Sequence, residues 1–202
     1  MSSQQRNETA SQEAPHPTQQ EQQRHQEWYS VYKPESDTAA PDPLDPGKRY
    51  HDGIWVKHHP STNKGTLFHV TGDVIAARGM RYEQRDDWTP GDSGPLHNLT
   101  FLGYVRKEEY ESGRLGRVLE ELPTPPKQQG INFWEKDPVT GRHELIWTRK
   151  DGEPYGSGEE RRKVFKCNEW TVAAVEKLKE VGLLKDEVKL EYRDEASFGS
   201  GE

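Results

Sequence analysis

The hydrophobic pattern is clearest near the C-terminal end of the chain. Apolar side chains recur there at steps of four, four and three, namely Trp170, Ala174, Leu178 and Val181. This spacing places them on one face of a helix, while most charged residues of the stretch fall elsewhere. The following Gly182 and the two leucines after it are typical of a C-terminal cap. The pattern therefore predicts an amphipathic helix that begins at or just after Cys167 and packs on a core.

Upstream of this helix the pattern changes to short β-rich runs. The runs at 54–56 and 66–71 are separated by a polar turn with Pro60 and Gly65, which predicts an antiparallel hairpin. The other predicted elements are strands at 79–84 and 99–105, a short helix at 115–122, a hairpin that joins 133–134 to 145–147, and a last strand at 187–192. Strands followed by a C-terminal helix indicate an α+β fold with a small antiparallel sheet.

Composition divides the chain into one domain and two polar ends. Residues 2–27 are mostly Gln, Glu, Ser, Thr and Pro, with no aliphatic residue larger than Ala. Such a segment cannot bury enough surface to offset the entropy of ordering. We therefore predict a disordered, acidic, Gln- and Pro-rich arm at 1–47, a single domain at 48–192 and a disordered tail at 193–202. The cluster at 28–32 interrupts the arm and is a candidate anchor on the domain.

Charge and cysteine usage exclude several partners and locations. A formal charge of -7 argues against nucleic acid and anionic membranes, because both require a basic surface. No apolar segment approaches the ~20 residues that span a bilayer, and the amino terminus lacks the apolar core of a secretory signal. A single cysteine permits no intrachain disulfide. We expect a chain of the cytosol or nucleus that is not secreted and has no integral membrane segment.

Three residues of the predicted domain carry candidate chemistry. Cys167, the only cysteine, stands where helix N–H groups and the helix dipole lower a thiol pKa below the ~8.5 of a free cysteine. His51 starts the first strand of the predicted hairpin and His69 lies towards the end of the second, so the two imidazoles are expected to be neighbours. The alternative is structural: free cysteines are often buried as small hydrophobes, and each histidine alone fits an ordinary strand position.

These residues also carry a family resemblance. The chain contains His51-Asp52-Gly53-Ile54-Trp55-Val56, then Leu67-Phe68-His69-Val70, and later Cys167-Asn168-Glu169-Trp170 at the head of a helix. This order resembles the permuted NlpC-type papain-like fold, which includes the lecithin:retinol acyltransferase-like proteins, and it is also similar to fungal proteins of no attached activity. The resemblance covers 50–70 and 164–184, under a third of the chain. Two positions depart from the family pattern. Asp52 stands where an aromatic residue is common, and Glu169-Trp170 replaces the His-Phe pair often seen after the nucleophile.

The resemblance implies a thiol-dependent acyl hydrolase or acyltransferase. Cys167 would be the nucleophile, His51 the base and His69 the residue that orients His51. An acyl group would be held as a thioester, and backbone N–H groups near Cys167 would stabilise the oxyanion. The expected substrate is a small molecule, a peptide or an acyl compound, with no cofactor and no metal. The mammalian acyltransferases carry membrane anchors that this chain lacks, so their lipid substrates are not carried over.

Two alternatives remain open at this point. The same fold can serve as a non-catalytic binding or interaction module, in which the pocket is kept without turnover. A more remote possibility is that the segment at 28–32 is itself the functional peptide.

Two further motifs are interpreted as structural. The run 91–95, Gly-Asp-Ser-Gly-Pro, is similar to the nucleophile loop of trypsin-like proteases but lacks one glycine, and Ser93 follows His69 too closely for two β-barrels. All five residues favour turns. His58 and His59 lie in a polar turn without a third ligand at a suitable spacing, so no zinc site is predicted.

Overall fold

The protein has a mixed α+β fold, as predicted. The computed structural model describes residues 27–38, 41–59 and 61–186. Its elements are β1 (Trp28–Asp37), β2 (Tyr50–Asp52), β3 (Ile54–His59), β4 (Lys64–Thr71), β5 (Arg81–Trp88), β6 (Leu96–Arg106), α2 (Lys107–Glu111), α3 (Arg114–Glu120), β7 (Gln129–Ile131), β8 (Leu145–Trp147) and α4 (Cys167–Glu180). A small antiparallel sheet and a C-terminal helix that contains the cysteine are therefore both present.

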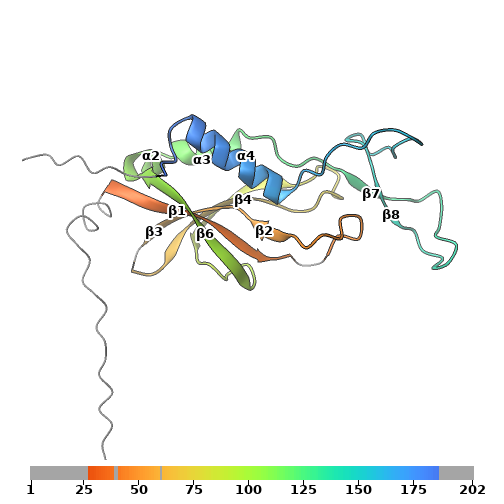
Figure 1. Ribbon diagram of the computed structural model, residues 1–202, viewed down its shortest axis with the longest axis horizontal. Helices are drawn as coiled ribbons and strands as arrows, with labels where there is room; N and C mark the ends of the chain where they lie inside the picture. The colour runs from red at the N-terminus through yellow and green to blue at the C-terminus, as the bar shows by residue number, and fades with distance from the viewer. Residues whose placement is uncertain (1–26, 39–40, 60, 187–202) are drawn as a thin grey trace, which may run out of the picture.

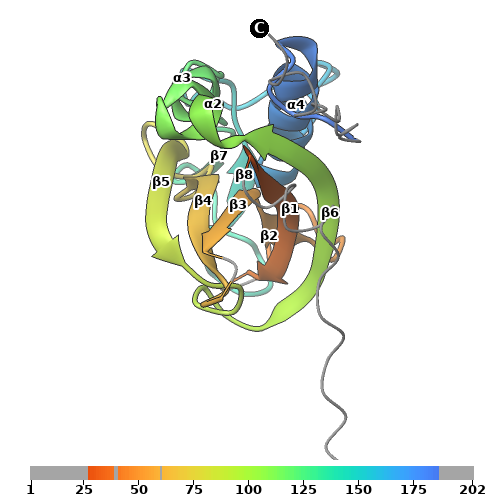
Figure 2. The same cartoon turned by 90° about the vertical axis from the view of Figure 1, so that its left-hand side faces the viewer.

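The main sheet is built around β1. This strand pairs with β6 along one edge and with β2 and β3 along the other, and β4 and β5 follow. The predicted first hairpin is confirmed, because Ile54 pairs with Phe68 and Trp55 with Leu67 across β3 and β4. Figure 2 shows the sheet curving between β5 and the long β6. Helices α2, α3 and α4 lie on one side of the sheet, and the small β7–β8 sheet lies beyond its end (Figure 1).

Alternation along the strands divides the interior into two clusters. The larger cluster joins the sheet to the helices and includes Ile54, Val56, Phe68, Val70, Trp170, Ala174 and Leu178. The smaller cluster contains Trp55, Leu67 and Trp88, with Tyr32 and Leu99 packed against it. The helix α4 is thus fixed to the sheet through the apolar face that its sequence predicts, and this attachment sets the position of its first residue, Cys167.

The C-terminal cap of α4 is also confirmed. Gly182 has a φ of 73°, its N–H bonds to the Lys179 carbonyl at 3.0 Å, and the Leu183 N–H bonds to the Leu178 carbonyl at 2.9 Å. This pair of hydrogen bonds is the Schellman motif, in which a left-handed residue is required after the helix. Glycine meets that requirement without steric cost.

The folded part begins earlier than the predicted boundary at residue 48. β1 lies within the predicted arm, yet Val31 is fully buried and Trp28 is 8% exposed. The cluster at 28–32 is therefore an integral strand of the sheet rather than a docked anchor. Composition hid this strand because few of its residues are apolar and polar sequence flanks it on both sides. Residues 1–26, the predicted strand at 187–192 and the predicted tail at 193–202 lie outside the described residues.

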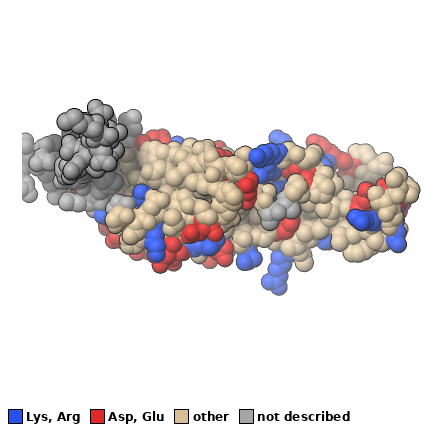
Figure 3. Space-filling view, turned by 90° about the horizontal axis from the view of Figure 1, so that it is seen from below, with Lys and Arg blue, Asp and Glu red and all other residues tan. Residues whose placement is uncertain are grey.

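The second predicted hairpin forms with a different first strand. β8 pairs with β7 at 129–131, and Phe133 and Trp134 follow that strand, each 69% exposed. Within the described part of the chain, no helix has the length and apolar character needed to cross a membrane. Acidic and basic side chains are intermixed on the face shown in Figure 3.

Candidate functional site

The two predicted histidines meet at one end of the sheet. Nε2 of His51 lies 2.8 Å from Nδ1 of His69, which confirms the predicted proximity. Gly53 lies between β2 and β3 and makes this approach possible. A Cβ at residue 53 would lie 2.7 Å from the Phe68 carbonyl oxygen and 2.8 Å from the His69 Cβ, and contacts this short do not occur between real atoms. Only glycine therefore fits between the two histidine-bearing strands.

Glu83 extends the histidine pair to a chain of three side chains. It pairs with His69 across β4 and β5, and its Oε2 lies 3.1 Å from Nε2 of His69. A carboxylate only accepts hydrogen bonds, so the His69 Nε2 carries the proton and its Nδ1 is an acceptor. His51 must then donate through its Nε2–H, which leaves Nδ1 of His51 unprotonated. The chain Glu83–His69–His51 thus sets the tautomer that a general base needs.

Both imidazoles are neutral near neutral pH. Burial and the neighbouring His51 ring lower the pKa of His69 to about 4, although Glu83 acts in the opposite direction. Burial also lowers the pKa of His51. Neutral rings are consistent with the tautomers assigned above, since a protonated imidazole would have no acceptor nitrogen.

Cys167 is the first residue of α4 and is 7% exposed. Its thiol donates to the Tyr50 carbonyl oxygen at 3.9 Å. Burial and the Asp52 carboxylate raise the pKa of the thiol to about 11, while the backbone N–H groups of Asp52, Asn168 and Cys167 itself act to lower it. The helix terminus thus acts in the expected direction, but burial outweighs it. The sequence predicted a lowered thiol pKa, and this prediction was wrong. The resting thiol is protonated.

The structure brings Cys167 next to the strand that carries His51 but gives the two side chains different partners. In the part of the chain that the structure describes, the sulfur makes no hydrogen bond to either ring nitrogen of His51. The residues on both sides of His51 are nevertheless bound to α4. The Asn168 amide donates to the Tyr50 carbonyl oxygen at 3.0 Å, and the Thr171 hydroxyl donates to Asp52 Oδ1 at 3.1 Å.

The Asp52 carboxylate has a structural role. It is buried against α4, and burial raises its pKa, while hydrogen bonds from Asn168 and Thr171 act to lower it. Asp52 therefore forms a polar clamp between β2 and α4. The clamp fixes the backbone around His51 relative to Cys167.

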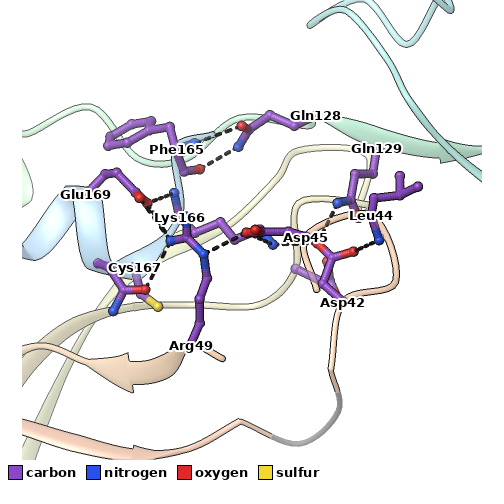
Figure 4. A network of polar contacts seen from close by, with 12 residues as sticks. Asp42, Leu44, Asp45, Arg49, Gln128, Gln129, Phe165, Lys166, Cys167 and Glu169 are labelled. Atoms are coloured by element: carbon purple, nitrogen blue, oxygen red, sulfur yellow. Dashed lines mark hydrogen bonds and ion pairs between the residues drawn. The ribbon is translucent and has the colours of Figure 1, made fainter. Parts of the chain in front are cut away.

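Glu169 holds the start of α4. Its Oε2 accepts the Lys166 N–H at 2.8 Å, as in a capping box, and its Oε1 accepts from Arg49 Nη1 at 2.9 Å (Figure 4). Burial acts to raise the pKa of Glu169, but the hydrogen bonds from Lys166 and Arg49 lower it overall. Arg49 also pairs with Asp45 at 2.6 Å. The loop that leads into β2 is thus tied to the start of α4.

The sequence carried no direct signal for three of these residues. Glu83 lies near the end of a predicted strand, but its role depends on which strand lies beside His69. Arg49 and Glu169 are 120 positions apart in the chain. The available hint was that Arg49, two residues before His51, and Glu169, two residues after Cys167, carry opposite charges.

The run 91–95 and the His58-His59 pair, both interpreted as structural, make contacts within the fold. The run 91–95 is the turn between β5 and β6, where the Ser93 hydroxyl accepts hydrogen bonds from Trp88 Nε1 at 3.0 Å and from Arg85 at 3.1 Å. His58 and His59 lie on β3 and not in the predicted turn, and His58 contacts the Thr66 hydroxyl at 3.2 Å.

Comparison with known families covers this entire site. A family model described as a family of unknown function, DUF6540, matches residues 41–185. The chain belongs to this family. The DUF6540 match contains both histidines, Glu83 and Cys167, and it begins after β1. No match was found among curated proteins or among solved structures.

Proposed function

We propose that the protein is a thiol-dependent acyl hydrolase or acyltransferase of permuted papain-like architecture. Cys167 is the nucleophile, His51 the base and His69 the residue that orients the base. One observation carries the proposal: the chain from Glu83 through His69 leaves Nδ1 of His51 as an acceptor on the strand against which Cys167 begins α4. The order of the three residues along the chain supports the same assignment.

The protonation states favour proton transfer during the reaction over a preformed thiolate–imidazolium pair. The thiol pKa of about 11 and the lowered pKa values of both histidines keep all three groups neutral at rest. Substrate binding must turn the thiol from the Tyr50 carbonyl towards Nδ1 of His51. Catalytic hydrogen bonds are often incomplete before substrate binds, so the resting contact is compatible with such a step.

The reaction then proceeds in two balanced stages. His51 takes the thiol proton as the sulfur attacks the acyl carbon, and backbone N–H groups at the start of α4 stabilise the oxyanion. The carbon–leaving-group bond breaks, His51 returns the proton to the departing amine or alcohol, and a thioester remains on Cys167. Water, an amine or an alcohol next attacks the thioester and gives its proton to His51. The acyl product leaves, and His51 returns the proton to the sulfur.

Acylation of the cysteine by an activated ester tests this proposal. The full chain is incubated with p-nitrophenyl acetate, release of nitrophenol is followed, and the acetyl group is located by peptide mass spectrometry. We expect a burst of nitrophenol with acetylation at Cys167. His51→Ala should slow the burst by about 10²-fold or more, the usual contribution of a general base. The control His59→Ala removes an exposed histidine and should behave as wild type.

Equal acetylation in wild type and His51→Ala would contradict the assignment of His51 as base. Complete absence of the adduct would favour the second candidate, a non-catalytic binding module. One observation favours that alternative: the buried thiol rests on a backbone carbonyl with a raised pKa and has no hydrogen bond to His51 among the described residues.

A further inference from the structure

The long strand β6 forms one edge of the main sheet. Among the described strands, β6 pairs with β1 and with no other. Figure 2 shows it as the outermost strand of the sheet on the side where α4 lies. Leu96 and Phe101 of this strand are 38% and 45% exposed. A long edge with exposed apolar side chains is a template for the addition of another strand, and folded proteins usually cover such edges.

The first rung of an added strand is already present on this edge. Lys185 forms an antiparallel bridge with Tyr104 of β6. The Tyr104 N–H donates to the Lys185 carbonyl oxygen at 2.8 Å, and the Lys185 N–H donates to the Tyr104 carbonyl oxygen at 2.9 Å. Such a reciprocal pair is the hydrogen-bonded pair of an antiparallel ladder. The antiparallel direction carries the residues after Lys185 along β6 towards Leu96.

Two further features of β6 suit a backbone that lies alongside it. Gly103 allows the close approach of Lys185, because a Cβ at residue 103 would collide with the Lys185 carbonyl oxygen. Further along the strand, the Leu99 N–H donates to the side-chain oxygen of Asn98 at 2.9 Å. Such local side-chain bonds offer the backbone an alternative to a ladder bond. A neighbouring strand can supply a carbonyl oxygen to this N–H in place of the side chain.

We propose that residues 187–192 of this chain add to the edge of β6 as an antiparallel strand. The segment follows directly after the described residues. Its sequence, Glu-Val-Lys-Leu-Glu-Tyr, alternates charged and apolar residues, so in an extended conformation Val188, Leu190 and Tyr192 share one face. Six extended residues span about 20 Å, which fits along the part of β6 between Leu96 and Gly103.

The proposed occupant is this chain and not a second molecule, because the segment begins two residues after a backbone pair that has already formed. A short tether gives the segment a high effective concentration at the edge, whereas another molecule must reach the edge by diffusion. The added strand also holds the C-terminal end of α4 against the sheet, since Lys185 follows its cap. The docking does not depend on acyl chemistry, so it stands even if Cys167 is inert.

Nuclear Overhauser contacts in the isotopically labelled full-length chain test the proposal. We expect contacts between backbone protons of residues 187–192 and those of Leu96–Leu102. A sample that mixes labelled and unlabelled chains identifies the source of the strand, because an isotope-filtered spectrum retains only contacts between two copies. Contacts within one chain, unchanged on dilution, are the expected result.

A proline substitution and a matched control make the test specific. Leu190→Pro removes a ladder N–H from the middle of the segment. Amides of β6 that face away from β1 should then exchange with solvent about ten-fold faster, since one or two ladder bonds of about 1 kcal/mol each are lost. Amides of β4, a strand paired on both sides, should keep their rates, which shows that the fold is intact. The control Ser197→Pro makes the same change beyond the segment and should exchange as wild type.

Three results would overturn the proposal. The first is the absence of contacts between residues 187–192 and β6 in the wild-type chain. The second is contacts that appear only between copies in the mixed sample, which would assign the edge of β6 to a second molecule. The third is equal exchange of the β6 amides in Leu190→Pro and Ser197→Pro.

Discussion

At the scale of single residues, the tautomer of the proposed base, His51, is set by a carboxylate two hydrogen bonds away. Glu83 fixes the proton on Nε2 of His69, and His69 fixes the proton on Nε2 of His51. Glu83→Gln keeps the shape of the side chain but adds an N–H donor that can face the ring nitrogen instead. Both tautomers of His51 should then be populated. We expect the burst of ester acylation to slow by less than about 10²-fold, because the base itself remains.

The readout that separates positioning from simple structural support is ¹⁵N NMR of the histidine side chains. Wild type should show an unprotonated Nδ1 on His51, and Glu83→Gln should show exchange between the two tautomers. Glu176→Gln removes an exposed acid on α4 and serves as the control. Identical His51 nitrogen shifts in Glu83→Gln and wild type would show that Glu83 has no positioning role.

The burial of His69 should make the stability of the protein sensitive to acid. The folded-state pKa of His69 is about 4, whereas an unperturbed histidine titrates near ~6.5. Between these values the unfolded chain binds a proton that the folded chain does not. The free energy of unfolding should therefore fall as pH decreases from ~6.5 to about 4, with up to ~3 kcal/mol of the fall due to His69.

Urea unfolding of wild type and His69→Gln across this pH range checks the prediction. The free energy of unfolding of the variant should depend less steeply on pH, although its value at pH 7 is lower. The residual slope includes His51, whose pKa burial also lowers. His59→Gln, at an exposed position, should keep the wild-type slope. A wild-type slope in His69→Gln would count against a buried neutral imidazole at residue 69.

At the scale of elements, the join between β2 and β3 decides whether the histidines meet. Gly53→Ala would place a methyl group against the Phe68 carbonyl and His69 Cβ. We expect a loss of about 1–3 kcal/mol in the free energy of unfolding, typical of overpacking, and a separation of the two imidazoles. Gly47→Ala is the matched control, because the nearest atom to its added Cβ is 4.0 Å away. Comparable stability of the two variants in urea unfolding would refute the proposed close approach.

The same element shows what the sequence could and could not predict. Two β-rich runs and the polar turn between them specified the hairpin of β3 and β4, and the predicted proximity of His51 and His69 is confirmed. His51 itself lies on the short strand β2, which pairs with β1 and not with β4, so the prediction that it starts the first hairpin strand was wrong. The helical period from Trp170 specified α4 and therefore the place of Cys167. These features follow from local patterns. The neighbour of β4 on its other side does not, so the role of Glu83 required the three-dimensional order of the strands. The thiol pKa was missed for a related reason, because burial arises from packing.

At the scale of the whole molecule, β1 is the strand that joins the two halves of the sheet. It pairs with β6 on one side and with β2 and β3 on the other, so its loss would leave β6 without a partner strand. The region matched by the DUF6540 family begins at residue 41, after this strand. A chain that begins at residue 41 should therefore fail to unfold cooperatively on heating, although the family match and all candidate site residues are intact.

A single substitution tests the same point without truncation. Val31→Asp would place a carboxylate at a fully buried position of β1, and we expect a destabilisation of about 4 kcal/mol or more. Val139→Asp makes the same change where 91% of the residue is exposed, and it should stay within about 0.5 kcal/mol of wild type. Thermal unfolding followed by circular dichroism gives both values. A similar Tm for the two variants would mean that β1 is a dispensable anchor, as its composition first suggested, and that the domain begins near residue 48. A collapse of Val31→Asp alone would place the N-terminal boundary of the folding unit before β1, outside the region that defines the family.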